Sequence, residues 1–251
     1  MSKWPTFETI EVEDDGAIVT VRLNRPRQNN AINSIMEDEF NRVLAQCDAD
    51  DEVKCVILAA NGKNFSAGHD IAQVAEEKAT GREPATIDGK CWFRTGEMLP
   101  AWNFRKALVA VVKGYVGPHA NALLFVADTV IAADNAQFSF EETRIGIGAP
   151  YGPYALMPFH FPMRVVKQLW LPGGWMDAET AHRLLFVNRV VPLGEEEAEA
   201  RRHAELFASM DLGNIIANKQ GVHQLYEACG LAGMIDVGRE PYEPQGAAAE
   251  E

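Results

Sequence analysis

Apolar and polar residues alternate at the start of the chain, and this pattern predicts a β-hairpin over residues 7–23 with its turn at Asp14-Asp15-Gly16. Asn33-Ser34 offers N-cap chemistry, and the apolar residues that follow recur every three or four positions, which predicts a helix. Continuous apolar runs are typical of strands that are buried on both faces. Strands in which apolar residues predominate are predicted at 53–60, 108–112 and 128–132, with a shorter candidate at 138–140.

The segments between these runs and the C-terminal part follow other patterns. The polar stretch 75–90 predicts a mobile surface segment, and 91–104 predicts a helix. We expect a turn over 114–120, a short buried helix over 121–127 and irregular structure over 146–163, which is rich in glycine, proline and aromatic residues. Four helical periods follow, at 164–171, 177–185, 195–210 and 215–229. Strands with interleaved helices, then helices only, indicate one α/β domain.

Composition narrows the classes of function. Of the 251 residues, 47% are hydrophobic, which is enough to form a core. The chain has 23 Lys and Arg against 36 Asp and Glu, a net charge of −13, and this disfavours nucleic acid and anionic membranes as partners. The four cysteines form no C-x-x-C pair, and neither a signal peptide nor a membrane-spanning apolar stretch is visible. We therefore expect a cytoplasmic protein with reduced thiols.

Three segments in fixed order carry a family resemblance. The first is Leu23-Asn24-Arg25-Pro26 with Asn30-Ala31-Ile32-Asn33, the second is residues 64–71 (NFSAGHDI), and the third runs from residue 110 through 128–132 to 136–142. Together they resemble the crotonase superfamily, the enoyl-CoA hydratase/isomerase family. The resemblance implies a single domain over 1–251. A spiral of ββα units would occupy about 7–190, C-terminal helices 191–240 would form a homotrimer or a dimer of trimers, and 241–251 would be a disordered tail.

The resemblance also implies an oxyanion hole. Enzymes of this family act on acyl thioesters through an enolate, and two backbone N–H groups hold the thioester oxygen. One donor would be the N–H of His69, in the Ala-Gly-X-Asp turn. The other falls on His119, where the family has a glycine stretch at a helix N-terminus. Here the chain departs from the pattern, because Pro118 has no N–H and His119 adds a side chain that would be strained if the backbone required a positive φ.

The acid/base positions of the family are only half retained. Of the two glutamates common in hydratases, the first falls on Ala122 and is absent, while the second falls on Glu142. A single carboxylate resembles the isomerases of the family and could move a proton between two carbon atoms. The imidazoles of His119 and His69 are further candidates for catalysis, because histidine titrates near neutral pH.

Substrate contacts are likewise implied by the resemblance. Coenzyme A would enter as part of the substrate, with no tightly bound cofactor. The residues expected to contact substrate or coenzyme A are Arg25, Arg27, Ala31, Ala67, Gly68, Asp70, Ile71 and Asn121. No group of His, Cys, Asp and Glu has the spacing of a metal site, so no metal is expected.

Three functions remain open at this point. The first is an acyl-CoA-processing enzyme of the hydratase/isomerase type, in which Glu142 moves protons. The second is a crotonase-fold hydrolase, resembling 6-oxocamphor hydrolase, that cleaves a C–C bond of a cyclic β-diketone without coenzyme A and uses His119. The third is a non-catalytic binding protein of the same fold. Coenzyme A affinity separates the first from the second, and turnover of any thioester or diketone excludes the third.

Overall fold

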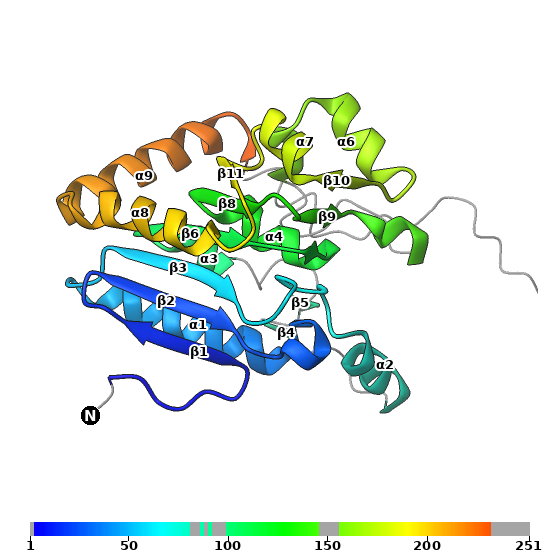
Figure 1. The fold of residues 1–251 in the computed structure, drawn as a ribbon, viewed down its shortest axis with the longest axis horizontal. Helices are drawn as coiled ribbons and strands as arrows, with labels where there is room; N and C mark the ends of the chain where they lie inside the picture. Colours follow the sequence, from blue (N-terminus) through cyan, green and yellow to red (C-terminus); the bar gives the residue numbers. More distant parts are fainter. Residues whose placement is uncertain (1–2, 81–85, 88–89, 92–98, 146–155, 232–251) are drawn as a thin grey trace, which may run out of the picture.

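The computed structural model describes residues 3–80, 86–87, 90–91, 99–145 and 156–231, and its centre is a six-stranded sheet (Figure 1). The strand order is β1-β2-β3-β6-β8-β11. The strands are β1 (Ile10–Asp14), β2 (Ile18–Leu23), β3 (Cys55–Ala60), β6 (Ala107–Val112), β8 (Thr129–Ala133) and β11 (Arg189–Val191). β1 and β2 form the expected antiparallel hairpin, and the other neighbouring pairs are parallel.

Helices cover both faces of this sheet. On one face, α1 (Ser34–Ala49) packs its apolar stripe on alternate residues of β2, β3 and β6. On the other face, Ala200 and Ala204 of α8 (Glu196–Ala208) pack on the intervening residues. Every residue of β3 and β6 is buried as a result, which explains why these strands are apolar without alternation.

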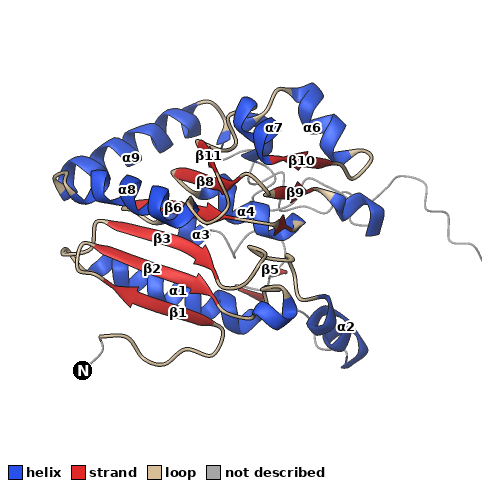
Figure 2. Ribbon diagram, in the orientation of Figure 1, coloured by secondary structure: helices blue, strands red, loops and turns tan. Residues whose placement is uncertain are grey.

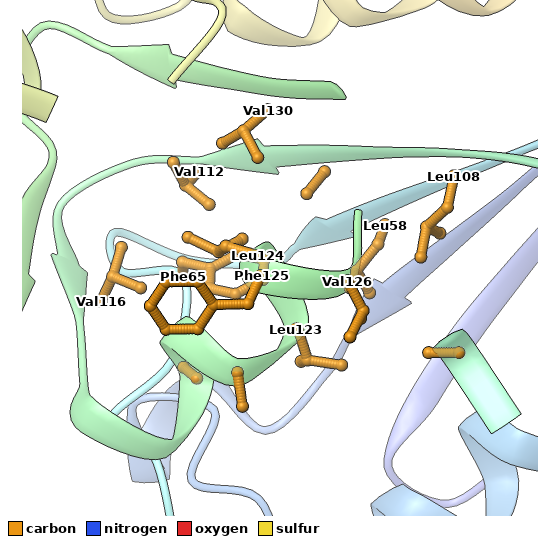
Figure 3. Packing of buried hydrophobic residues seen from close by; sticks show 14 of the residues in the cluster. Leu58, Phe65, Leu108, Val112, Val116, Leu123, Leu124, Phe125, Val126 and Val130 are labelled. Atoms are coloured by element: carbon orange, nitrogen blue, oxygen red, sulfur yellow. The ribbon is translucent and has the colours of Figure 1, made fainter. Parts of the chain in front are cut away.

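A short helix, α4 (Pro118–Val126), passes through the interior beside the sheet (Figure 3). Every residue of α4 from His119 onward is buried. Leu123, Leu124 and Phe125 pack among side chains from β3, β6 and β8, such as Leu58 and Val130 (Figure 3). The core therefore fixes the position of both ends of α4.

Two smaller sheets accompany the large one (Figure 2). The first has the order β10-β9-β7 and contains β7 (Tyr115–Val116), β9 (Gln137–Ser139) and β10 (Trp175–Asp177). The second pairs β4 (Thr86–Ile87) with β5 (Lys90–Cys91). The other helices in the described part of the chain are the 3₁₀ segments η1 (Pro26–Gln28) and η3 (Glu141–Ile145), with α2 (Ile71–Thr80), α3 (Leu99–Asn103), α5 (Met157–His160), α6 (Met163–Trp170), α7 (Ala178–Arg183) and α9 (Leu212–Ala228).

Several sequence expectations are wrong in detail. The predicted turn 114–120 contains β7 and the first turn of α4, because proline at the first helical position starts a helix rather than preventing one. Residues 75–80 belong to α2, and Cys91 belongs to β5 instead of the helix predicted over 91–104. The C-terminal part contains β10 and β11 in addition to helices. The described part of the irregular segment predicted over 146–163 contains helix α5 (Met157–His160). Residues 146–155 and the whole predicted tail, 241–251, lie outside the described residues.

No helix in the described part of the chain combines the length and apolar character needed to cross a bilayer.

Candidate active site

Two loops meet beside the N-terminal end of α4. The loop after β3 runs alongside β7, where the N–H of Ser66 donates to the carbonyl of Tyr115 (3.3 Å) and the N–H of Gly117 donates back to the carbonyl of Ser66 (2.7 Å). Further along the loop, Ile32 donates its N–H to the carbonyl of Gly68 (2.7 Å) and accepts from the N–H of Asp70 (2.9 Å). The peptide groups on both sides of His69 are therefore held in place by backbone hydrogen bonds.

Glycine is required where these two loops touch. A Cβ atom on Gly117 would lie 2.2 Å from the carbonyl oxygen of Ala67, which is a direct overlap. Gly68 has φ +87°, and a Cβ atom there would lie 3.2 Å from the backbone nitrogen of His119. The structure thus brings the backbone of Gly68, which precedes His69, against the amide of His119.

The departure from the family pattern at Pro118-His119 costs no backbone strain. Pro118 is the first residue of α4 and His119 the second. Among the described non-glycine residues, positive φ angles occur at Asn29, Asn30 and Leu185, so the strain considered for His119 is not found. The N–H of His119 belongs to the first turn of α4, where amide groups point out of the helix end and the helix dipole favours negative charge.

The side chains of the same two histidines form a buried group with Glu37 of α1. The imidazole rings of His69 and His119 are stacked, with centroids 3.5 Å apart and planes inclined by 17°. His119 Nε2 lies 3.4 Å from Glu37 Oε1, and these two side chains are only 3% and 5% exposed. One ligand-type atom from each of the three residues lies within 4.8 Å of the others. Spacing along the sequence did not indicate this group, because its three members lie far apart in the chain, and the expectation that no metal is bound stays a prediction.

Burial controls the charge of both imidazoles. Desolvation lowers the pKa of His69 to about 3. Desolvation, together with the neighbouring His69, holds the pKa of His119 well below its usual range. Both rings are consequently neutral near pH 7, and each has one nitrogen that can accept a hydrogen bond or bind an ion.

Glu37 was not predicted as a site residue, although its position on the helix can be read from the sequence. It precedes Phe40 and Leu44 by three and seven positions, so it lies on the apolar face of α1. An acidic residue at the start of a helix is ordinarily explained by the helix dipole and solvent exposure. A carboxylate on the buried face is the informative exception.

Glu142 lies in η3, directly after β9, and is 5% exposed. Its neighbour Glu141 accepts hydrogen bonds from Arg144 Nη1 (3.0 Å) and from Ser139 Oγ (2.9 Å). Asn121 of α4 donates to the carbonyl of Ser139 (2.7 Å), which ties α4 to the segment that carries Glu142. The Arg144 ion pair therefore belongs to Glu141, and Asn121 has a structural contact that its sequence position did not reveal.

Most of the residues expected to contact coenzyme A lie in two segments, the one between β2 and α1 and the one after β3. Arg25 Nη1 donates to Asp70 Oδ2 (2.8 Å) and to the carbonyl of Ala31 (2.5 Å). Asp70 thus helps to order its turn, and the guanidinium of Arg25 is already engaged within the protein. Arg27 is exposed on η1, and Ile71 is 60% exposed at the start of α2. Contacts of these residues with coenzyme A remain predictions.

Comparison with known proteins gives a consistent result. The family model described as Enoyl-CoA hydratase/isomerase matches residues 13–228. A probable enoyl-CoA hydratase of Mycobacterium bovis is 31% identical over 92% of this chain and 87% of its own length. Carnitinyl-CoA dehydratase of Escherichia coli is 31% identical over 79% of this chain and 74% of its own.

Solved structures agree with the sequence comparison. The crystal structure of an enoyl-CoA hydratase/isomerase from Xanthobacter autotrophicus matches with a TM-score of 0.82 and 28% identity, over 93% of this chain and 85% of that one. That of an enoyl-CoA hydratase from Mycobacterium marinum matches with a TM-score of 0.75 and 30% identity, over 86% of this chain and 99% of that one.

Proposed function

Since the chain belongs to the enoyl-CoA hydratase/isomerase family and has the crotonase fold, we propose that it processes acyl-CoA thioesters through an enolate and moves protons with one carboxylate, that of Glu142. Acyl-CoA processing of the hydratase/isomerase type is supported at the level of the family. The observation that carries the finer proposal is the close approach of the Gly68-His69 backbone to the amide of His119.

The oxyanion hole supplies the electrostatic part of the reaction. The N–H groups of His69 and His119 donate to the thioester oxygen as it gains negative charge, and the N-terminus of α4 adds its dipole. A donor of this type is worth ~2.7–4 kcal/mol of transition-state stabilisation. The hydrogen bonds that Ile32 makes on both sides of His69 keep the loop in position before substrate arrives.

Glu142 supplies the proton transfer. Ala122, which is fully buried on α4, has no group that could act as a second acid or base. With one carboxylate the reaction that fits is an isomerisation. The Glu142 carboxylate takes a proton from C2 of a 3-enoyl thioester and returns it at C4, while the double bond moves from C3–C4 to C2–C3. The proton and electron pair are conserved within the substrate, and no further reactant is needed.

The experiment is a comparison of Glu142→Gln with Glu141→Gln in turnover of 3-enoyl- and 2-enoyl-CoA esters. Glu142→Gln should lower kcat for isomerisation by about 10²–10⁴-fold, because the amide cannot accept the proton. Glu141→Gln is the matched control, since Glu141 contacts Ser139 and Arg144. Equal rates in the two variants would contradict the role of Glu142. A protein that turns over cyclic β-diketones and does not bind coenzyme A would contradict the thioester assignment itself.

Assembly into a homotrimer or a dimer of trimers is part of the same proposal. Helix α9 carries Val222, Leu225 and Tyr226, all exposed in the single chain, which is consistent with a surface that another copy covers. Light scattering after gel filtration should give a mass three or six times that of the chain. A monomeric mass would contradict this part of the proposal.

A further inference from the structure

We propose that Glu37, His69 and His119 bind one divalent transition-metal ion, with zinc as the ion that best suits two imidazoles and a carboxylate. Nothing in the proposed isomerisation requires a metal, so the inference stands apart from the proposed function. It rests on the position, burial and chemistry of three side chains that come from separate parts of the sequence.

The spacing of the ligand atoms is close to that of a bound ion. Zinc–nitrogen and zinc–oxygen bonds are ~2.0–2.2 Å long, so two ligand atoms on one tetrahedral ion lie about 3.4 Å apart. The three candidate atoms lie within 4.8 Å of one another, and His119 Nε2 and Glu37 Oε1 are already 3.4 Å apart. Binding therefore requires the longer separations to shorten by up to roughly 1.4 Å, together with a rotation of the two stacked imidazole rings so that their nitrogens converge.

The framework around the cluster can provide this change. Glu37 and His119 are held on helices α1 and α4, and both side chains are buried. His69 lies in a loop and is less completely buried than His119, so we expect its ring to be the one that turns as an ion enters. Two of the ligands are thus held on helices and the third on a loop.

The ligand set selects the class of ion. Two imidazoles and a carboxylate suit zinc and its neighbours in the first transition series, whereas magnesium and calcium prefer oxygen ligands. Three protein ligands leave a fourth position open for water or for an oxygen atom of a bound molecule. A comparable pair on the surface, His203 Nε2 with Glu199 Oε1 at 3.3 Å, lies on one helix face and, among the described residues, has no second histidine in such a group.

The test uses the full chain, first treated with a chelator and then titrated with Co²⁺ and Zn²⁺. Elemental analysis after dialysis should give one zinc per chain, and Co²⁺ should produce the visible absorption of a four-coordinate site with nitrogen ligands. Replacement of a residue that only supports a metal ligand already weakens binding 10–100-fold, so loss of a ligand in His69→Gln or Glu37→Gln should raise Kd by more than ~100-fold. His203→Gln is the control and should bind as the wild type does.

Two outcomes overturn the proposal. One is a wild-type protein that takes up no stoichiometric metal and shows no Co²⁺ absorption. The other is a Kd for His69→Gln equal to that of His203→Gln, which would place any bound ion elsewhere. Far-UV circular dichroism of each variant checks folding, and if Glu37→Gln does not fold, the partly exposed His69 decides the result. None of these readouts depends on turnover, so failure here leaves the proposed isomerisation intact, and failure of Glu142 leaves this site intact.

Discussion

Replacement of Gly68 by alanine tests the proposed oxyanion hole without mutating either histidine. Gly68 has φ +87°, and its new Cβ atom would lie 3.2 Å from the His119 nitrogen and 3.5 Å from the His119 Cβ. Gly16, in the turn of the first hairpin, has a similar φ of +72° but no heavy atom within 4 Å of the corresponding position. Both variants therefore introduce backbone strain, but only Gly68→Ala also crowds His119, so comparing the two separates these effects.

The expected magnitudes differ between stability and activity. An alanine forced into the left-handed region costs ~1–2 kcal/mol at either position. A loss of that size lowers Tm by roughly 2–8 °C in a chain of this length. In Gly68→Ala the crowding also moves the His119 N–H away from the thioester oxygen, and loss of one donor costs about 10²–10³-fold in kcat. Gly16→Ala should lose stability only.

The assay is kcat and KM for short- and medium-chain enoyl-CoA esters, measured beside Tm for both variants and the wild type. We expect the two Tm values to fall together and kcat to fall in Gly68→Ala alone. If Gly68→Ala loses stability but keeps the kcat of Gly16→Ala, the amide of His119 is not an oxyanion donor. The assignment of the hole to His69 and His119 would then be refuted.

Three further predictions concern the protein around the site. Lys106 is buried and donates to carbonyl groups at the C-terminal end of α1, so Lys106→Met should lower the free energy of unfolding by ~1.5–3 kcal/mol in denaturant titrations. Burial raises the pKa of Cys47 to about 12 and raises that of Cys55, so native-state alkylation followed by mass spectrometry should modify the exposed Cys229 and leave both unlabelled. Burial lowers the pKa of His160, so below pH ~6.5 the unfolded chain binds a proton that the folded chain resists. Stability should therefore fall with decreasing pH by at most ~1.4 kcal/mol per unit from this group, and His160→Gln should flatten that slope in thermal melts.

The elements that the sequence predicted well are those with strong local signals. The parallel strands β3, β6 and β8 are buried on both faces, so their apolar runs are unbroken. Helix α1 begins as expected, with the Asn33 side chain accepting the N–H of Met36. In each case the residues that define the element are adjacent in sequence, and tertiary contacts reinforce what the local pattern already favours.

The missed elements lack such signals. β10 and β11 have three residues each, which is too short for an alternating pattern, and both are defined by their pairing with β9 and β8. The start of α4 was missed because Gly117 and Pro118 have the composition of a turn, although proline suits the first turn of a helix equally well. Strand pairing determines β10 and β11, and burial determines the start of α4, and neither can be read from the local sequence.

The candidate site also combines residues that the sequence indicates with one that it does not. His69 and Glu142 are predicted from the sequence because the family resemblance assigns a role to their positions in the chain. Glu37 could not be found in this way, because its role arises only when α1 is packed beside the N-terminus of α4. A buried carboxylate on an apolar helix face is nevertheless visible in the sequence, and it is the kind of exception that local periodicity can detect.

The histidine at position 119 changes the chemistry of the site without changing its backbone. His119 is helical and has no positive φ, so its N–H belongs to the first turn of α4, while its imidazole extends toward Glu37 and His69. The backbone and the side chain of one residue can thus serve two purposes that respond differently to substitution. Every residue except proline at this position keeps the N–H, whereas only a nitrogen or oxygen ligand keeps the cluster. The proposed oxyanion hole therefore depends on the backbone at this point, whereas the Glu37-His69-His119 cluster depends on the side chains of this sequence.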